Sequence, residues 1–362
     1  MTECLVLSGS EKAALAKADA AIVQARPPGG VPATLPLQHR AHAAALSRSG
    51  KLVNARSELE LSLVAARNRS GAYGACMATS REDIEFPSGG VLLRGWLYRP
   101  AETLPGPAVV MAHGLSAVRE MFLDRYAERF ATAGFTTLVY DHFGFGSSDG
   151  EPRQCPAPSV QLDGYRDAIS WLGGQPSVDA DRIGIWGSSF SGGEVIILAS
   201  ENLPIRCAVA QVPALGEGGP DVPAAALAAI TRAVEDGRDD VILPAVTETR
   251  DGLGVMFEDG SYDWFTRVAA QRAPSWRNEL RVSGLFEPFR PIDHLADANV
   301  PLLLVVAPAD TLTPPGPGIA VAASVPAIRV VEIPGGHFDA YEAGFEASVG
   351  PAIDWYRRYL MS

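Results

Sequence analysis

The sequence predicts an α/β fold in which helices cover both faces of a mostly parallel sheet. From residue 82 onward, short apolar runs alternate with helical segments, which is the pattern of repeated strand–helix units. Most of the runs are apolar throughout, as expected of strands buried on both faces. With 362 residues, 47% of them hydrophobic, the chain can form one large domain with an appendage.

Residues 1–80 are predicted to be an N-terminal helical extension. Strong helix formers fill residues 11–25 and about 37–66, with a proline- and glycine-rich break between them. Residues 68–80 are predicted to be a linker that leads into the core. Three roles remain open for the extension: a second lid, an arm that forms a homodimer, or a mobile tail.

The core elements follow one another from residue 83. Apolar or alternating runs predict strands at residues 83–86, 91–98, 107–114, 136–144, 181–187, 205–213, 300–310 and 329–336, the first two as a hairpin. Amphipathic or strongly helical stretches, several of them ended by glycine, predict helices at residues 122–134, 160–174, 188–200 and 345–360.

One interval breaks this alternation. About 90 residues separate the strand near residues 205–211 from the strand near 302–306, far more than a plain crossover needs. We expect an inserted helical cap at residues 215–290, between core segments 81–214 and 291–362. Its aromatic residues either line a substrate pocket or form the cap's own core, and the candidates for substrate contact are Phe257, Trp264, Phe265 and Phe286.

The stretch IGIWGSSFSGGEV, residues 183–195, suggests a nucleophilic serine. A nucleophile elbow has the pattern G-x-S-x-G between a strand and a helix. Centred on Ser189, the pattern keeps Gly187 but has Ser191 at the last glycine. The alternatives are that Ser189 is an ordinary helix N-cap, or that Ser191 is the nucleophile. Ser191 falls in the first helical turn, which favours a hydroxyl that caps the backbone.

A nucleophilic serine needs a base, and the base needs an acid that orients it. His337 follows the last strand, where glycines turn the chain toward the sheet edge, and Asp310 ends the strand before it. Asp310 could instead cap the next turn, and Asp339 is a rival acid. His294 precedes the penultimate strand and is too early. The order Ser189, Asp310, His337 is that of the α/β-hydrolases.

An oxyanion formed at the carbonyl would need backbone N–H donors. The strand at residues 107–114 ends at His113-Gly114, so the N–H groups of Leu115 and Phe190 are the predicted donors. His113 and Asp141 are expected to shape the neighbouring loops.

These motifs resemble those of the α/β-hydrolase superfamily, most closely its dienelactone-hydrolase-like and acetyl-esterase-like bacterial branch. The resemblance covers roughly residues 82–361 and rests on HGLSAVREMF, DHFGFGSSDGEPR, GIWGSSFSGG, APADTLTP and GGHFDAY. It implies the α/β-hydrolase fold with an eight-stranded sheet, no cofactor, and an acyl-enzyme on Ser189. The departures are Ser191, the large cap and the N-terminal extension.

Composition excludes several other classes. The net charge of −12 argues against a nucleic-acid partner. The four cysteines lack the spacing of a disulfide framework or zinc site, so no metal is expected. No apolar run spans a membrane and the N-terminus does not resemble a secretory signal, so we expect a cytoplasmic protein.

The sequence therefore predicts a serine hydrolase that cleaves a small-molecule carboxylic ester or thioester. The cap aromatics favour a moderately large apolar acyl or aryl group. One alternative is a natural-product pathway hydrolase or cyclase that acts on a thioester held by an acyl carrier, or on a C–C bond. Another is a catalytically weak binding or scaffold protein with a hydrolase fold.

Overall fold

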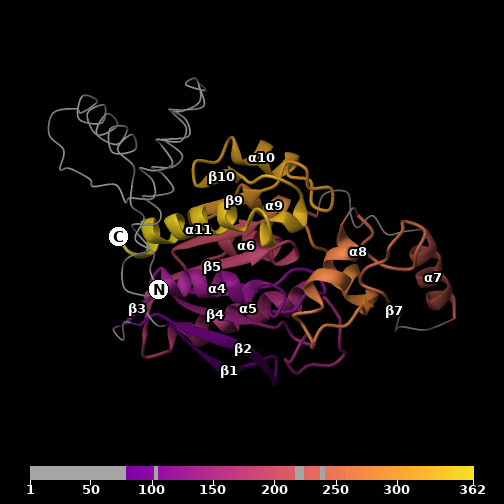
Figure 1. The fold of residues 1–362 in the computed structure, drawn as a ribbon, viewed down its shortest axis with the longest axis horizontal. Helices are drawn as coiled ribbons and strands as arrows, with labels where there is room; N and C mark the ends of the chain where they lie inside the picture. The colour runs from indigo at the N-terminus through magenta and orange to yellow at the C-terminus, as the bar shows by residue number, and fades with distance from the viewer. Residues whose placement is uncertain (1–78, 102–104, 217–223, 237–240, 259) are drawn as a thin grey trace, which may run out of the picture. The chain divides into compact units, whose positions relative to one another are not determined.

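The computed structural model describes residues 79–101, 105–216, 224–236, 241–258 and 260–362 (Figure 1). They belong to one compact unit, Met77–Ser362. The predicted N-terminal helices of residues 1–80 lie outside the described residues.

An eight-stranded, mostly parallel sheet forms the centre of this unit, which confirms the predicted fold class. Its strand order is β1-β2-β4-β3-β5-β6-β9-β10. Strand β2 runs antiparallel to both of its neighbours, β1 and β4, and the other neighbouring pairs are parallel. The strands are β1 (Ser80–Ser88), β2 (Val91–Arg99), β3 (Gly106–Ala112), β4 (Thr136–Tyr140), β5 (Val178–Ser188), β6 (Cys207–Gln211), β9 (Leu302–Val306) and β10 (Ile328–Glu332).

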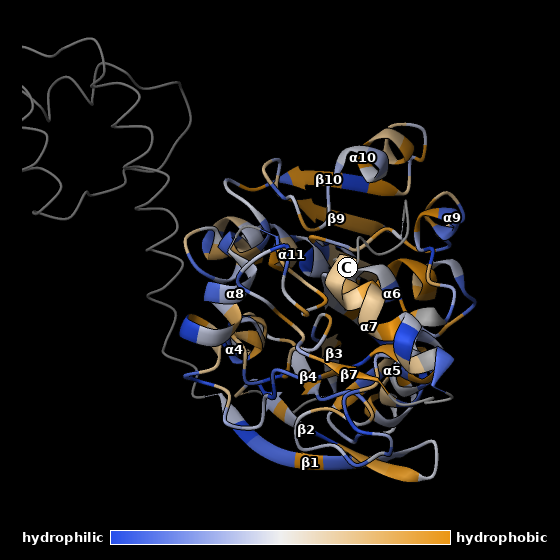
Figure 2. Ribbon diagram, turned by 90° about the vertical axis from the view of Figure 1, so that its right-hand side faces the viewer, coloured by the Kyte–Doolittle hydropathy of each residue, from blue (hydrophilic) through white to orange (hydrophobic). Residues whose placement is uncertain are grey.

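Burial follows the apolar runs of the sequence. Strands β4, β6 and β9 are buried at every residue, as expected where helices cover both faces. Strand β1 lies at the sheet edge and is mostly exposed and hydrophilic (Figure 2), and its charges disfavour pairing with another edge.

Helices form a layer on each side of the sheet. A buried apolar cluster lies on each face of the sheet. One packs under α4 and α11, and the other packs under α5, α6 and α10. None of the described helices is both long and apolar enough to cross a membrane. The core helices are α4 (Leu123–Thr132), α5 (Pro158–Gly173), α6 (Phe190–Ser200), α9 (Ile292–Leu295), α10 (Gly316–Ala322) and α11 (Phe345–Leu360).

The interval between β6 and β9 contains its own short elements, coloured from pink to orange in Figure 1. One longer helix, α7, lies in this interval, within the bounds of the predicted cap. The rest has little regular structure, in keeping with its lack of a sustained apolar period. Its elements are α7 (Ala224–Glu235), β7 (Ile242–Leu243), α8 (Ser261–Asp263), the π-helical η2 (Trp264–Ala269), β8 (Leu280–Arg281) and the 3₁₀-helical η3 (Val282–Phe286).

Candidate active site

Ser189 occupies the tight turn between β5 and α6. Its backbone has φ 59° and ψ −117°, a region that a residue with a side chain rarely adopts. Surrounding hydrogen bonds hold this conformation: the Ser189 N–H donates to the Gln211 carbonyl at 2.9 Å, and its carbonyl accepts from the N–H of Gly193 at 3.1 Å and Ala214 at 2.8 Å. Strain of this kind persists only where the surroundings fix it, and it is common at active sites.

The turn also requires glycine at Gly187. A Cβ built there would lie 2.1 Å from the carbonyl oxygen of Ser191, a distance no real contact allows. The end of β5 can approach the first turn of α6 this closely only without a side chain. The side chain of Ser189 therefore stands at the tip of the turn, and it lines a cavity.

Ser191, the rival nucleophile, is fully buried beneath the same turn. Its Oγ lies 2.5 Å from the His113 carbonyl oxygen, 2.7 Å from Glu194 Oε2 and 2.9 Å from His142 Nε2. It thus bonds to a neighbouring loop, whereas the sequence led us to expect a cap on its own helix. Ser191 is not among the residues that line the cavity of Ser189 or the smaller hollow beside His337.

Asp310 and His337 meet although 27 residues separate them. His337 Nδ1 lies 2.8 Å from Asp310 Oδ2, and both residues are buried, His337 at 6% exposed and Asp310 at 5%. The other carboxylate oxygen of Asp310 accepts the N–H groups of Leu312 and Thr313 at 3.0 and 2.8 Å. One oxygen thus caps the turn while the other contacts the imidazole, so the cap does not prevent Asp310 from contacting His337.

Thr313 also belongs to the site, although the sequence analysis did not propose it as a site residue. Its Oγ1 lies 2.8 Å from Asp310 Oδ2, 3.1 Å from His337 Nδ1 and 3.0 Å from the Val212 carbonyl oxygen, and its single proton can go to one of these acceptors at a time. The hydroxyl therefore lies between the acid, the imidazole and the residue that follows β6. Only the tertiary fold brings these groups together, since Thr313 lies 101 residues from Val212.

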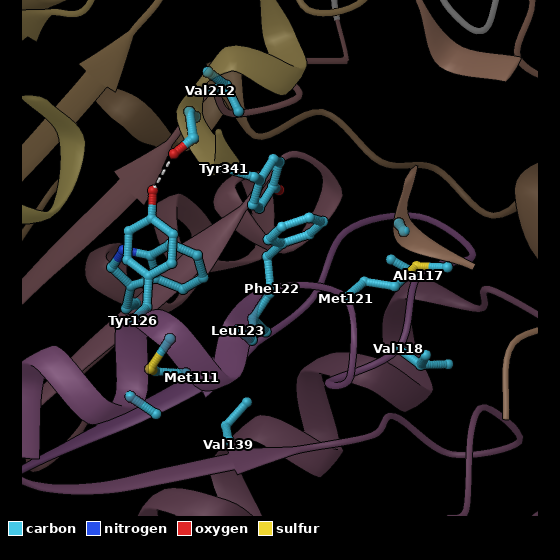
Figure 3. Close-up of a cluster of buried hydrophobic side chains, with 14 of the residues drawn as sticks. Met111, Ala117, Val118, Met121, Phe122, Leu123, Tyr126, Val139, Val212 and Tyr341 are labelled. Atoms are coloured by element: carbon cyan, nitrogen blue, oxygen red, sulfur yellow. Dashed lines mark hydrogen bonds between the residues drawn. The ribbon is translucent and has the colours of Figure 1, made fainter. Parts of the chain in front are cut away.

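The segment that carries His337 is joined to the Ser189 turn through their neighbours. Tyr341 lies in the 3₁₀ helix η4 (His337–Tyr341), and its hydroxyl is 2.5 Å from the Oγ of Ser188. Tyr341 also packs beside Phe122 and Tyr126 (Figure 3). No hydrogen bond joins Ser189 Oγ to His337 among the described residues. Such catalytic contacts often tighten only when substrate is bound.

The loop after β3 passes directly over Ser189. A Cβ at Gly114 would lie 2.7 Å from Ser189 Cβ, so this position also needs glycine. The next residue, Leu115, lines the cavity together with Ser189 and Phe190. The N–H groups of Leu115 and Phe190 donate to no other described residue, which leaves two backbone donors next to Ser189.

The cavity that Ser189 lines has a volume of about 1060 Å³. Ligand pockets commonly hold roughly 300–1,000 Å³, so it can accept a large group. Much of its wall is apolar, and the ring of Phe190 stacks on that of Phe289 at 4.2 Å between centroids. The apolar side chains that line it include Leu115, Phe190, Met256, Phe257, Leu285 and Phe289.

The four aromatic residues proposed for substrate contact divide among different places. Phe257 lines the cavity of Ser189. Trp264 borders a smaller hollow of about 240 Å³ beside His337 and stacks on Phe338. Phe265 is buried against Trp264 and Trp276 and lines neither space. The side chain of Phe286 lies outside what the structure describes.

Phe289, one of the aromatic residues of the insertion, also lines this cavity, whereas sequence reasoning did not consider apolar side chains such as Met256 and Leu285. The position of Phe289, between two prolines at the end of the insertion, was the available signal for an irregular segment near the sheet edge.

Buried polar groups support the two loops beside Ser189. Asp141 accepts the N–H of Arg119 at 2.8 Å and also pairs with its guanidinium. Burial lowers the pKa of His113 and lowers that of His142 well below its usual value, so both rings are neutral at pH 7. Within the described ranges, no group of three or more His, Cys, Asp or Glu side chains could hold a metal ion.

Several known proteins are similar to parts of this chain. The family described as X-Pro dipeptidyl-peptidase (S15 family) matches residues 89–217. A thiohydrolase of Eupenicillium brefeldianum is 32% identical over 247 residues, covering 65% of this chain and 79% of the relative. The polyketide transferase grgF of a Penicillium species is 32% identical over 200 residues, covering 54% and 64%. The crystal structure of the α/β hydrolase GrgF from Penicillium sp. sh18 has a TM-score of 0.65 at 24% identity, covers 78% of this chain and 100% of its own, and shares the fold.

Proposed function

The chain belongs to the α/β-hydrolase superfamily, and we propose that it is a serine hydrolase that cleaves a carboxylic ester or thioester. The observation that carries the proposal is the strained, cavity-lining Ser189, whose turn shares neighbours with the Asp310–His337 pair. A nucleophile at a strand–helix turn, with acid and base after later strands, is the arrangement with which α/β-hydrolases carry out acyl transfer.

In this mechanism Ser189 Oγ attacks the substrate carbonyl carbon, and His337 Nε2 accepts the hydroxyl proton. Asp310 holds the Nδ1–H of His337 and stabilises the imidazolium. The N–H groups of Leu115 and Phe190 stabilise the oxyanion. The tetrahedral intermediate collapses, the C–O or C–S bond breaks, and His337 gives its proton to the departing alcohol or thiol. His337 then activates a water molecule, which releases the acid and regenerates Ser189.

The cavity favours a large acyl group over acetate. A volume of about 1060 Å³ exceeds what a short acyl chain fills, and most of the residues that line the cavity are apolar. This supports a second candidate within the same chemistry: a chain delivered as a thioester by an acyl carrier, with hydrolysis, cyclisation or transfer as the final step. The names of two relatives, a thiohydrolase and a polyketide transferase, favour this candidate.

A fluorophosphonate probe tests the acyl-enzyme directly. We expect the folded protein to be labelled on Ser189 within the tryptic peptide of residues 183–206, with the label lost in His337→Ala. The peptide also contains Ser188, Ser191 and Ser200, so fragment ions must place the adduct. A label on Ser191 would contradict the assignment. A folded sample that is never labelled would favour the binding or scaffold alternative.

Matched substrates then separate the two candidates. An ordinary esterase turns over p-nitrophenyl acyl esters at least as fast as the N-acetylcysteamine thioester of the same acyl chain. An enzyme for carrier-bound chains prefers the thioester, and prefers it more as the chain lengthens.

Gly114→Ala tests the role of the loop over Ser189. The added methyl group would lie 2.7 Å from Ser189 Cβ and 3.1 Å from the Ser188 carbonyl oxygen, so the loop must move. A shift of about 1 Å in a catalytic group lowers kcat about 100-fold, and we expect a loss of that order here. Gly350→Ala is the matched control, because nothing lies within 4 Å of its added Cβ. Equal activities of the two variants would remove the Gly114 loop from the mechanism.

A further inference from the structure

A buried polar cluster lies between the Ser189 turn and the loop of residues 113–115, here called the oxyanion loop. It consists of Ser191 and Glu194 on α6, His142 after β4 and His113 after β3, and each side chain is at most 1% exposed. We call it the Ser191 cluster. None of its members lines the cavity, so the proposed mechanism gives its buried carboxyl and imidazole groups no task.

The number of protons available to Ser191 limits how its three contacts can coexist. A hydroxyl donates one hydrogen bond and accepts up to two. The His113 carbonyl oxygen can only accept, and it lies 2.5 Å from Ser191 Oγ. If Ser191 gives its proton to that carbonyl, Glu194 and His142 must both donate to Ser191.

His142 can meet this requirement as a neutral ring. Its Nδ1 has no hydrogen-bond partner among the described residues, so the proton can sit on Nε2, which faces Ser191 at 2.9 Å. Glu194 can meet it only as a carboxylic acid, because an ionised carboxylate has no proton to donate.

We propose that the Ser191 cluster holds the oxyanion loop in its catalytic position only while Glu194 is protonated. In that state the chain of bonds runs from the Glu194 carboxylic acid to Ser191, and from Ser191 to the His113 carbonyl. When Glu194 loses its proton, its carboxylate competes with the His113 carbonyl for the single proton of Ser191. The oxyanion loop then loses the bond that fixes it to α6. The inference rests on the proposed function, in which this loop supplies the Leu115 N–H.

The surroundings of Glu194 favour the protonated form near neutral pH. Burial raises the pKa of Glu194 to about 8, although the hydrogen bond with Ser191 lowers it. The titratable groups around Glu194 are His142, whose Nε2 lies 3.5 Å from Glu194 Oε2, His113 beside His142, and the phenols of Tyr140 and Tyr165. Asp141 approaches from the His113 side, 3.9 Å from its Nε2, and is paired with Arg119.

Glu194→Gln is the informative variant, because the amide donates to Ser191 at every pH. For the wild type we expect kcat to fall as pH rises through about 8. For Glu194→Gln this alkaline fall should be absent, so the ratio of kcat at pH 9.5 to kcat at pH 7 should exceed the wild-type ratio about tenfold. Equal ratios in the two proteins would overturn the proposal. KM should change little, because no member of the cluster touches the cavity.

Ser191→Gly is the second variant, in case Glu194→Gln folds poorly. It removes the hydroxyl and restores the glycine of the elbow pattern. We expect its kcat at pH 7 to be about tenfold below that of the wild type, because the oxyanion donor is less firmly held. We also expect no further fall in its kcat as pH rises through about 8. An alkaline fall like that of the wild type would contradict the proposal, because the hydroxyl that Glu194 is said to control would be missing.

A measurement without turnover separates this proposal from the proposed function. In Ser189→Ala, the amide signals of Gly114 and Leu115 should titrate with a midpoint near pH 8 in ¹H–¹⁵N spectra, and Glu194→Gln in the same background should abolish this. Titration without any hydrolysis by the wild type would refute the esterase and leave the proton-dependent loop standing. Hydrolysis by the wild type with no titration of these amides would refute the loop proposal alone.

Discussion

Replacing Ser189 with alanine should lower kcat by about 10⁴-fold or more, because the acyl-enzyme can no longer form. Residual turnover would come from the oxyanion donors and the shape of the cavity. KM should change little, since the hydroxyl forms its bond to substrate only in the reaction. The measurement is steady-state hydrolysis of the best acyl ester or thioester, with fluorophosphonate labelling of the same samples.

Ser200→Ala is the matched control, because Ser200 lies at the end of the same helix and in the same tryptic peptide. Its hydroxyl bonds the Ile197 carbonyl at 2.7 Å and lies outside the cavity of Ser189. We expect kcat and labelling of this variant to match the wild type. Retention of more than about a tenth of the activity in Ser189→Ala would show that another residue carries the acyl group.

Most of the fold could be predicted because the sequence signals were local and mutually consistent. Continuous apolar runs identified the buried strands, and the closing helix was predicted at residues 345–360, the bounds that α11 has. The Gly187-Ser188-Ser189 stretch predicted a strand–helix turn, and β5 and α6 meet there. Each signal needs only a few neighbouring residues to be recognised.

The site residues that were missed depend on contacts between distant segments. Thr313 acts across 101 residues and Tyr341 across 153, and no local pattern marks such a partner. The cavity wall was predicted from aromatic residues alone, but Phe265 packs inward while Met256 and Leu285 line the space. Which face of an irregular segment lines a cavity depends on tertiary packing, which has no period in the sequence.

Replacing Asp310 with asparagine should lower kcat by about 10⁴-fold at pH 7 while the protein remains folded. An asparagine oxygen can still accept the N–H groups of Leu312 and Thr313, so the turn is preserved. The amide cannot stabilise the imidazolium, and it favours the His337 tautomer that carries its proton on Nε2. In that tautomer His337 has no lone pair with which to accept the proton of Ser189.

Asp339→Asn is the decisive comparison, because Asp339 is the rival acid and lies two residues from His337. Its carboxylate accepts the N–H of Gly336 at 2.8 Å, a bond that an asparagine oxygen can also make. We expect its kcat to stay within about threefold of the wild type. Because both substitutions remove one negative charge from a residue near His337, a general electrostatic effect would lower both activities. A large loss in Asp310→Asn alone would show that the 2.8 Å contact with His337 Nδ1 is what catalysis needs. The reverse ranking would assign the acid to Asp339.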